Sequence, residues 1–167
     1  LAGALRALPS LGLLLLGWVL LAPRLPGDAA FVLPSLIVLA VLAIPPVLSG
    51  VYSGIAEVDP AARDAAKGMG MTGMQVLRRV EIPVALPLIL SGVRAGLLQI
   101  IATATIAAYV SLGGLGRYLI DGLAARDYTQ MAGGALLVAG LALLMELVFT
   151  LVQKLVVSPG LADQEAR

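Results

Sequence analysis

Long uninterrupted apolar stretches constrain this chain more than any other feature. Four of them approach the roughly 20 residues that an α-helix needs to cross the hydrocarbon core of a bilayer: Leu1–Leu21, Phe31–Ile55, Leu86–Tyr109 and Met131–Val157. A soluble helical bundle would need helices with a polar outer face, and the stretch "FVLPSLIVLAVLAIPPVLSG" has none. The sequence therefore predicts an all-α, polytopic integral membrane bundle with about four spans.

The composition removes several kinds of chemistry. These 167 residues contain no cysteine and no histidine, which excludes disulfides, thiol catalysis and histidine-based acid–base or zinc sites within them. No cluster of acids or nucleophiles lies within the spans, so we expect no catalytic residue and no bound metal. The net charge of +1 provides no basic field for nucleic acid.

The basic residues predict an orientation. Four of them lie between the second and third apolar stretches: Arg63, Lys67, Arg78 and Arg79. The other connections hold only one or two basic residues each. Basic loops face the cytoplasm in most membrane proteins, so we expect segment 57–83 and the tail 158–167 to be cytoplasmic. The chain starts with Leu inside an apolar pattern, and we expect a further segment upstream.

Segment 57–83 begins with signals for a short helix. Asp59 followed by Pro60 is a typical helix start, because Asp caps backbone N–H groups and Pro at the first position forfeits an N–H that has no partner there. Strong helix formers follow up to Lys67. Gly68 and Gly70 then favour a helix end, because glycine adopts the left-handed conformation found there.

A second short helix is predicted after this glycine elbow. Thr72 and Gln75 match the capping box, and we expect the helix to stop near Ile82, because the residue before a proline is pushed out of helical geometry. Two such short helices are marginal in water. We expect a partner or the protein's own membrane-facing surface to hold them, and a solvated loop is the alternative.

The glycines of this elbow also match a nucleotide-binding pattern. Gly68, Gly70 and Gly73 fit G-x-G-x-x-G, but that motif functions between a strand and a helix of a βαβ unit. Here an Ala-rich helix precedes it and membrane spans flank it. No P-loop sequence is present either, so any ATP would be bound by another chain and we expect no cofactor on this one.

The same segment resembles the cytoplasmic signature of ABC importer permease subunits. That signature reads E-A-A, three residues, Gly, nine residues, then I-x-L-P. This chain has Asp64-Ala65-Ala66, Gly70 and the run 80–83 at the same spacing, with Asp for Glu, Val for Ile and Ile for Leu. The resemblance implies a coupling helix that docks on a separate ATPase subunit, through Asp64, Ala65, Ala66, Lys67, Gly68, Met69, Gly70, Met71 and Pro83.

Longer stretches narrow the resemblance. "IAEVDPAARDAAKGMGMTGMQVLRRVEIPVALPLILSGVRAG" and "TATIAAYVSLGGLG" look like the permeases of osmoprotectant importers, which carry glycine betaine, carnitine, choline or proline. This likeness implies a type I importer fold in a bacterial inner membrane, with one transmembrane permease domain over 1–157 that lacks its N-terminal part. The implied partners are an ATPase subunit, a second identical or different permease and an extracytoplasmic substrate-binding protein. Methionine permeases share the glycine-rich segment and remain the alternative.

Polar residues in the third span are candidates for the translocation path. Gln99, Thr103 and Thr105 lie in this otherwise apolar stretch, and polar groups in spans usually face a bundle interior or water. The alternative is that the threonines bond their own backbone. The same span carries Gly92 and Gly96, a small-xxx-small spacing that allows close helix packing.

After this span the sequence turns glycine-rich at 111–116 and then predicts a short interfacial helix over 115–123. A gate, a docking surface for a binding protein and an ordinary surface loop all fit it. Two other functional classes also remain open, an ion-coupled secondary transporter and a non-transporting membrane scaffold.

Overall fold

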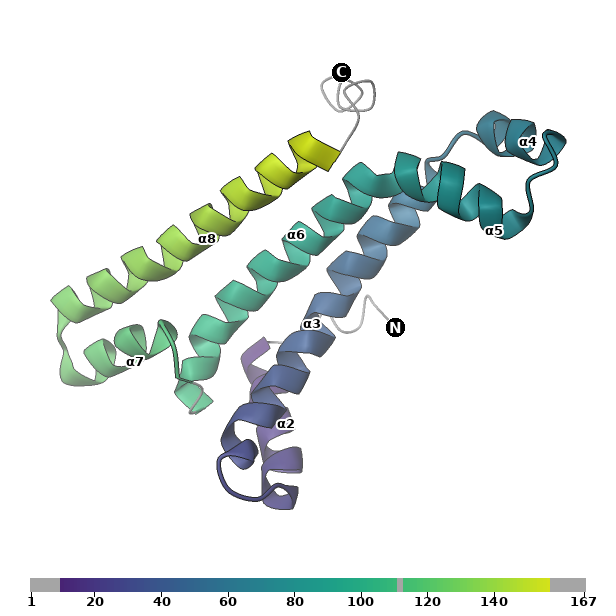
Figure 1. Ribbon diagram of the computed structural model, residues 1–167. Coiled ribbons are helices and arrows are strands. Elements are labelled where there is room, and N and C mark those ends of the chain that lie inside the picture. Colours follow the sequence, from purple (N-terminus) through teal and green to yellow (C-terminus); the bar gives the residue numbers. More distant parts are fainter. Residues whose placement is uncertain (1–9, 111–112, 157–167) are drawn as a thin grey trace. The chain divides into compact units, whose positions relative to one another are not determined.

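The computed structural model describes residues 10–110 and 113–156, and within these ranges the chain is helical, with short turns and no strand (Figure 1). The predicted tail 158–167 and the start of the first predicted span lie outside the described residues. In chain order the elements are α2 (Ser10–Leu21), the 3₁₀ turn η1 (Ala22–Arg24), α3 (Ala29–Ala56), α4 (Pro60–Gly68), α5 (Gly73–Val76), the π turn η2 (Leu77–Glu81), α6 (Ile82–Ala107), the 3₁₀ turn η3 (Ala108–Val110), α7 (Gly116–Ala125) and α8 (Tyr128–Val156).

Three helical stretches among the described residues are long and apolar enough to cross a membrane: Ala29–Ala56, Gly73–Val110 and Tyr128–Val156. The shortest has 28 residues and is about 42 Å long at 1.5 Å per residue, more than the roughly 30 Å of a bilayer core. The 12 residues of α2 span only about 18 Å. The last three predicted spans are therefore confirmed as long apolar helices, and α2 is the described part of the first.

The contacts divide the chain into two compact units. Of the described residues, one unit comprises 10–45, 96–110 and 113–146, and the other 46–95 and 147–156. In α3 the division falls between two consecutive prolines. Because proline lacks the N–H that an α-helix requires, two hydrogen bonds of the helical ladder are missing at this point.

The first unit has a small apolar core and well-defined turns. Leu14 of α2 packs with Val38 and Leu42 of α3 and with Ala107 at the end of α6. Asp127 caps α8, its carboxylate accepting the N–H groups of residues 129 and 130 at 3.0 Å each. The short helix predicted after the glycines is present as α7.

In the second unit α3 and α6 cross at a close glycine contact. A Cβ placed on Gly92 would lie 2.8 Å from the Cα of Gly50 and 2.9 Å from the carbonyl oxygen of Pro46. One turn along, a Cβ on Gly54 would lie 2.9 Å from the carbonyl oxygen of Ala85. The close packing expected from the small residues of this span is confirmed at Gly92.

The predicted stop at Ile82 is wrong, because α5 continues through η2 into α6 without a break. Ile82 keeps helical angles, φ −61° and ψ −47°, and its N–H donates to the carbonyl of Leu77, five residues earlier. In a regular α-helix the ring of Pro83 would clash with the carbonyl of Arg79. The helix passes this proline after the π turn Leu77–Glu81, which contains Arg79, and α6 continues past Pro87 as well.

We expect the substitution Gly92→Ala to destabilise the protein, because its methyl group would overlap backbone atoms of α3. Overpacking of this kind costs about 1–3 kcal/mol, so the purified protein should melt several degrees lower in detergent. Gly140→Ala on α8 is the matched control, because a Cβ there meets no described atom within 4 Å. Equal melting temperatures for the two variants would contradict the close crossing.

Candidate functional site

The helix α4 starts as its sequence predicts. The carboxylate of Asp59 accepts the N–H of Ala61 at 2.8 Å, and Pro60 occupies the first helical position. The cap satisfies one of the N–H groups that lack an intrahelical partner at a helix start. Local sequence therefore fixes where this nine-residue helix begins.

The end of α4 is a Schellman motif. The N–H of Met71 donates to the carbonyl of Ala66 at 3.2 Å, and the N–H of Gly70 donates to the carbonyl of Lys67 at 2.9 Å. This pattern requires a left-handed residue after the helix, and Gly70 has φ +83°. The predicted glycine elbow is confirmed, with Gly70 as the residue that needs to be glycine.

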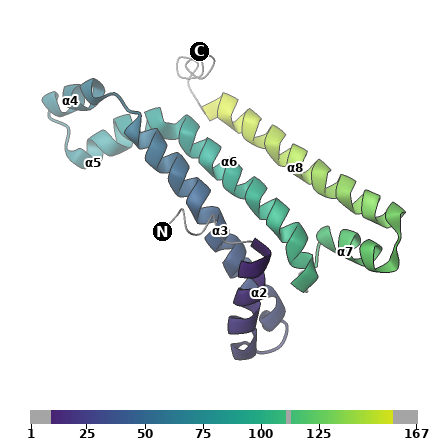
Figure 2. The same cartoon turned by 180° about the vertical axis from the view of Figure 1, so that it is seen from behind.

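The next helix begins at the predicted capping box. The N–H of Thr72 donates to Oε1 of Gln75 at 2.8 Å. The elbow therefore turns the chain sharply between two capped helix ends. Both ribbon views show α4 lying beside α5, next to the end of α3 and the start of α6 (Figures 1 and 2).

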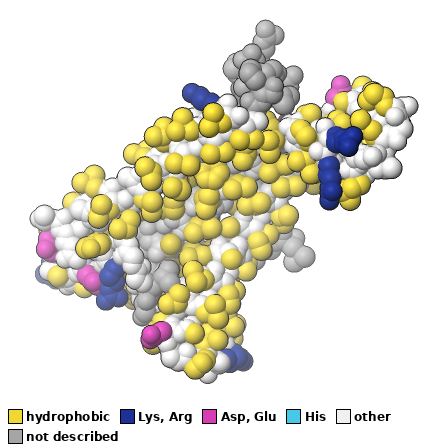
Figure 3. Space-filling model, in the orientation of Figure 1, with side chains coloured by type: hydrophobic (Ala, Val, Ile, Leu, Met, Phe, Trp, Pro, Cys, Tyr) yellow, Lys and Arg dark blue, Asp and Glu magenta, His cyan; other side chains and the backbone are white. Residues whose placement is uncertain are grey.

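The helix α4 has an inner and an outer face. Ala66 is 1% exposed and belongs, with Val58 and Val76, to the buried apolar residues of this region. Met71 is half-buried, and the other residues predicted to couple to an ATPase are exposed: Asp64, Ala65, Lys67, Gly68, Met69, Gly70 and Pro83. The space-filling view shows charged side chains over α4 and α5, whereas hydrophobic side chains cover the visible faces of the long helices (Figure 3).

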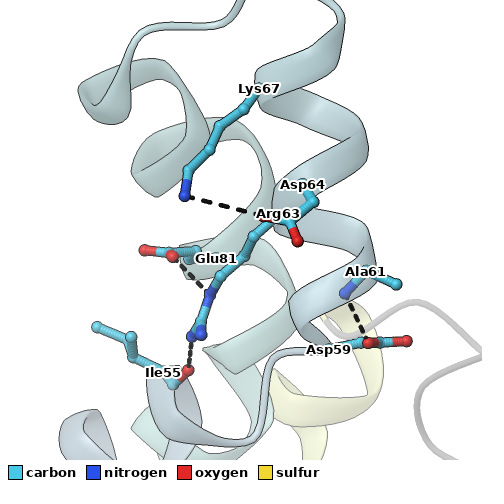
Figure 4. Close-up of polar contacts among 7 residues, drawn as sticks. All are labelled: Ile55, Asp59, Ala61, Arg63, Asp64, Lys67 and Glu81. Atoms are coloured by element: carbon cyan, nitrogen blue, oxygen red, sulfur yellow. Dashed lines mark hydrogen bonds and ion pairs between the residues drawn. The ribbon is translucent and has the colours of Figure 1, made fainter.

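Arg63, which the sequence analysis counted only among the basic residues that predict the orientation, carries the closest polar contacts of the region. Its Nε lies 2.7 Å from Oε1 of Glu81, an ion pair in which the N–H does not point along the line between the two atoms. Its Nη2 donates to the carbonyl of Ile55 (Figure 4). Both charges were visible in the sequence, but no local spacing rule pairs residues separated by a helix, an elbow and a second helix.

The other ion pair of α4 is weak. Nζ of Lys67 lies 4.0 Å from Oδ1 of Asp64, and both side chains are more than 60% exposed. Exposed pairs of this geometry contribute little to stability. These two side chains therefore remain available on the outer face of α4.

The predicted path residues lie on α6, within the first unit. Gln99 is an exposed residue, and its side-chain amide donates to the hydroxyl of Thr103 at 3.4 Å in a part-buried hydrogen bond. Thr103 is 2% exposed. The hydroxyl of Thr105 donates to the carbonyl of Ile101 at 2.9 Å, as in the alternative interpretation, and the residue also lines a mostly apolar cavity of about 190 Å³.

The described residues offer no obvious centre for bond chemistry. They contain no group of three or more His, Cys, Asp or Glu side chains placed to hold a metal. The exposed outer face of α4 and the polar side chains of α6 are therefore the candidate binding features among the described residues.

Fold and site together define a class, that of multi-pass helical membrane proteins with a capped helical elbow inserted between two long apolar helices. More specifically, the chain belongs to the family described as the binding-protein-dependent transport system inner membrane component, whose model matches residues 2–158. The predicted all-α permease fold and the predicted family are confirmed. Membership of this family also confirms that the chain is part of a multi-pass membrane protein.

Individual relatives support this assignment. The chain is 35% identical over 128 residues to the glycine betaine/carnitine/choline transport system permease protein OpuCB of Bacillus subtilis, covering 77% of this chain and 59% of that protein. It is 33% identical over 145 residues to the osmoprotectant import permease protein OsmW of Salmonella typhimurium, covering 87% and 66%. The chain thus spans about three fifths to two thirds of the length of these relatives.

A solved structure shares the fold. An inward-facing conformation of the MetNI methionine ABC transporter superposes with a TM-score of 0.81, covering 94% of this chain and 73% of that chain at 22% identity. At this level of identity the likeness supports the fold alone.

Proposed function

We propose that this chain is the permease subunit of an ATP-driven importer for a compatible solute such as glycine betaine, carnitine, choline or proline. The observation that carries the proposal is segment 59–75, in which the signature residues Asp64, Ala65 and Ala66 lie on a capped helix with an exposed outer face. The names of the relatives supply the solute class. The permease role rests on the family.

The outer face of α4 is the proposed docking surface for a separate ATPase subunit. Its exposed residues include Asp64 and Lys67, and Met69, the C-cap residue that follows α4, is 72% exposed. ATP is bound and hydrolysed by that subunit, so this chain is not itself an enzyme and carries no cofactor. Movement of the ATPase subunits displaces α4, and the spans then switch between inward- and outward-facing states. Binding of ATP and of the solute shifts the populations of these two states.

The remaining partners follow from the same role. A second permease subunit completes the path, and an extracytoplasmic binding protein delivers the solute. We place the protein in the inner membrane of a bacterial cell, with the permease domain over 1–157 and with segment 57–83 and the C-terminus in the cytoplasm. The chain has only 4% aromatic residues, and quaternary ammonium groups are typically bound in aromatic cages, so tight selection belongs to the binding protein.

Gln99, Thr103 and Thr105 are the proposed lining of the path. Gln99 and Thr103 lie four residues apart and are hydrogen-bonded on one face of α6. The side chain of an exposed Gln in a predominantly apolar helix can contact a solute directly, whereas the buried Thr103 holds it in place. Thr105 is one turn from Ile101 and lines the neighbouring cavity.

Uptake assays test the proposed function. We expect cells that lack the locus to regain ATP-dependent uptake of labelled glycine betaine at high osmolarity when the full-length gene and its neighbours are restored. The substitution Gly70→Asp should abolish this uptake while the protein stays in the membrane, because it adds bulk and charge to the docking surface. Methionine uptake without betaine uptake would contradict the proposed solute class but would agree with an ATP-driven importer.

The matched control is Gly27→Asp. Gly27 also has a positive φ, +57°, and a Cβ at either position meets no described atom within 4 Å. The two substitutions therefore impose similar backbone strain, but only one of them alters the elbow. Normal uptake by Gly70→Asp would contradict the coupling role, and uptake unaffected by loss of the ATPase subunit would favour an ion-coupled transporter.

The path residues have a separate test. We expect Gln99→Ala to raise the solute concentration that gives half-maximal uptake, because the side-chain amide is lost while the helix is preserved. Leu136→Ala on α8, a truncation at a side chain 74% exposed, controls for changes in membrane insertion. If Gln99→Ala leaves the concentration dependence of uptake unchanged, Gln99 does not line the path. If Thr103→Ala also leaves the solute flux normal, a non-transporting membrane scaffold is favoured.

A further inference from the structure

Arg63 lies on the inner side of α4 and contacts two other helical elements. Its side chain is 25% exposed, in contrast to the 62% of Lys67 on the same helix. The guanidinium reaches the carbonyl of Ile55 and the carboxylate of Glu81 (Figure 4). We call these three residues the Arg63 bridge.

The first contact is at the end of α3. Ile55 is the next-to-last residue of this helix, and its carbonyl is among the last four, which have no intrahelical N–H partner. It accepts the N–H of Val58 at 3.3 Å as well as Nη2 of Arg63. The charged donor from α4 thereby joins α4 to the last turn of α3.

The second contact is at the start of α6. Glu81 is the last residue of the π turn, and its side chain is 17% exposed. Ile82, the next residue, opens α6. A planar guanidinium can contact two acceptors at once in fixed directions, which a lysine ammonium cannot match. One side chain therefore links α4 to the adjoining ends of both long helices.

The other connections of α4 to the rest of the second unit differ in kind. The turn 57–59 joins it to α3, and the elbow 69–72 joins it to α5, with a left-handed glycine in the middle. Val58, Ala66 and Val76 supply apolar burial, which is non-directional. The ion pair between Asp64 and Lys67 stays within α4. Among the described side-chain contacts, the hydrogen bond to Ile55 and the ion pair with Glu81 thus join α4 to both long helices.

We propose that Arg63 is a positioning residue that transmits displacement of α4 to α3 and α6 together. This inference rests on the proposed importer function. Without the bridge, α4 keeps its caps, its elbow and its apolar contacts, so it folds and still docks. Displacement of α4 is then taken up in the turns instead of moving the two long helices.

The test uses the complete transporter, with its ATPase and binding protein, reconstituted in proteoliposomes with glycine betaine and ATP. We expect Arg63→Met to assemble in normal amounts and to hydrolyse ATP, while the solute transported per ATP falls about tenfold. Arg63→Lys should give an intermediate ratio. A purely structural role would change the amount of complex but not this ratio, so a wild-type ratio in Arg63→Met would overturn the proposal.

The matched control is Arg24→Met. Arg24 also donates to a carbonyl near a helix end, that of Leu20, but this contact is local, four residues apart in the chain. Its removal should leave the ratio of solute to ATP unchanged. If Arg63→Met does not assemble, Glu81→Gln replaces it, because an amide keeps the shape and an acceptor oxygen but not the charge. A wild-type ratio in both Glu81→Gln and Arg63→Lys would overturn the proposal.

A second readout needs no knowledge of the solute. Because these residues include no cysteine, Ser91→Cys on α6 introduces one thiol into them, which a maleimide labels in the assembled complex to the extent that water reaches it. We expect its labelling rate to change on addition of ATP and vanadate, and the change to be lost with Arg63→Met. A retained change would overturn the Arg63 proposal, as would the absence of any change in the wild type. Failure of betaine uptake by the wild type would instead count against the proposed function.

Discussion

The bilayer interior offers no water to the backbone, and this constraint shapes the chain. Each N–H and C=O group in a span must be satisfied within the protein, which limits spanning segments to helices and closed barrels. The described residues contain three apolar helical stretches that are long enough to span the bilayer. Within 10–110 and 113–156, irregular backbone lies in short connections, such as the turn before α3 and the elbow between α4 and α5. The site is built from these connections, where charge and glycine are tolerated.

Close backbone packing and directed polar contacts do different work in the second unit. The crossing of Gly50 and Gly92 brings α3 and α6 together without side chains between them, as expected where dispersion contacts replace the hydrophobic effect in driving helix association. The Arg63 bridge then ties the ends of the same two helices to α4. The surface that we propose for docking of the ATPase subunit is thereby joined to the long apolar helices α3 and α6.

Much of this could be predicted from the sequence because the signals are local. The Asp59 cap, the left-handed Gly70 and the box at Thr72 each depend on residues within a few positions of one another, and the structure contains all three. The continuous helix through Pro83 could not be predicted, because the rule about residues before proline does not anticipate a π turn. The pairing of Arg63 with Glu81 depends on how the elbow folds back, which no spacing rule encodes. The path residues on α6 were found by their polarity alone, and their role stays a prediction.

The most direct measurement is site-specific photo-crosslinking in the assembled transporter. A photoreactive residue in place of Met69, the exposed residue directly after α4, should form an adduct with the ATPase subunit, whereas one in place of Leu123 on α7, 60% exposed, should not. This result would place the elbow at the ATPase interface. An ATPase adduct from position 123, or none from position 69 in a complex that transports solute, would contradict the account.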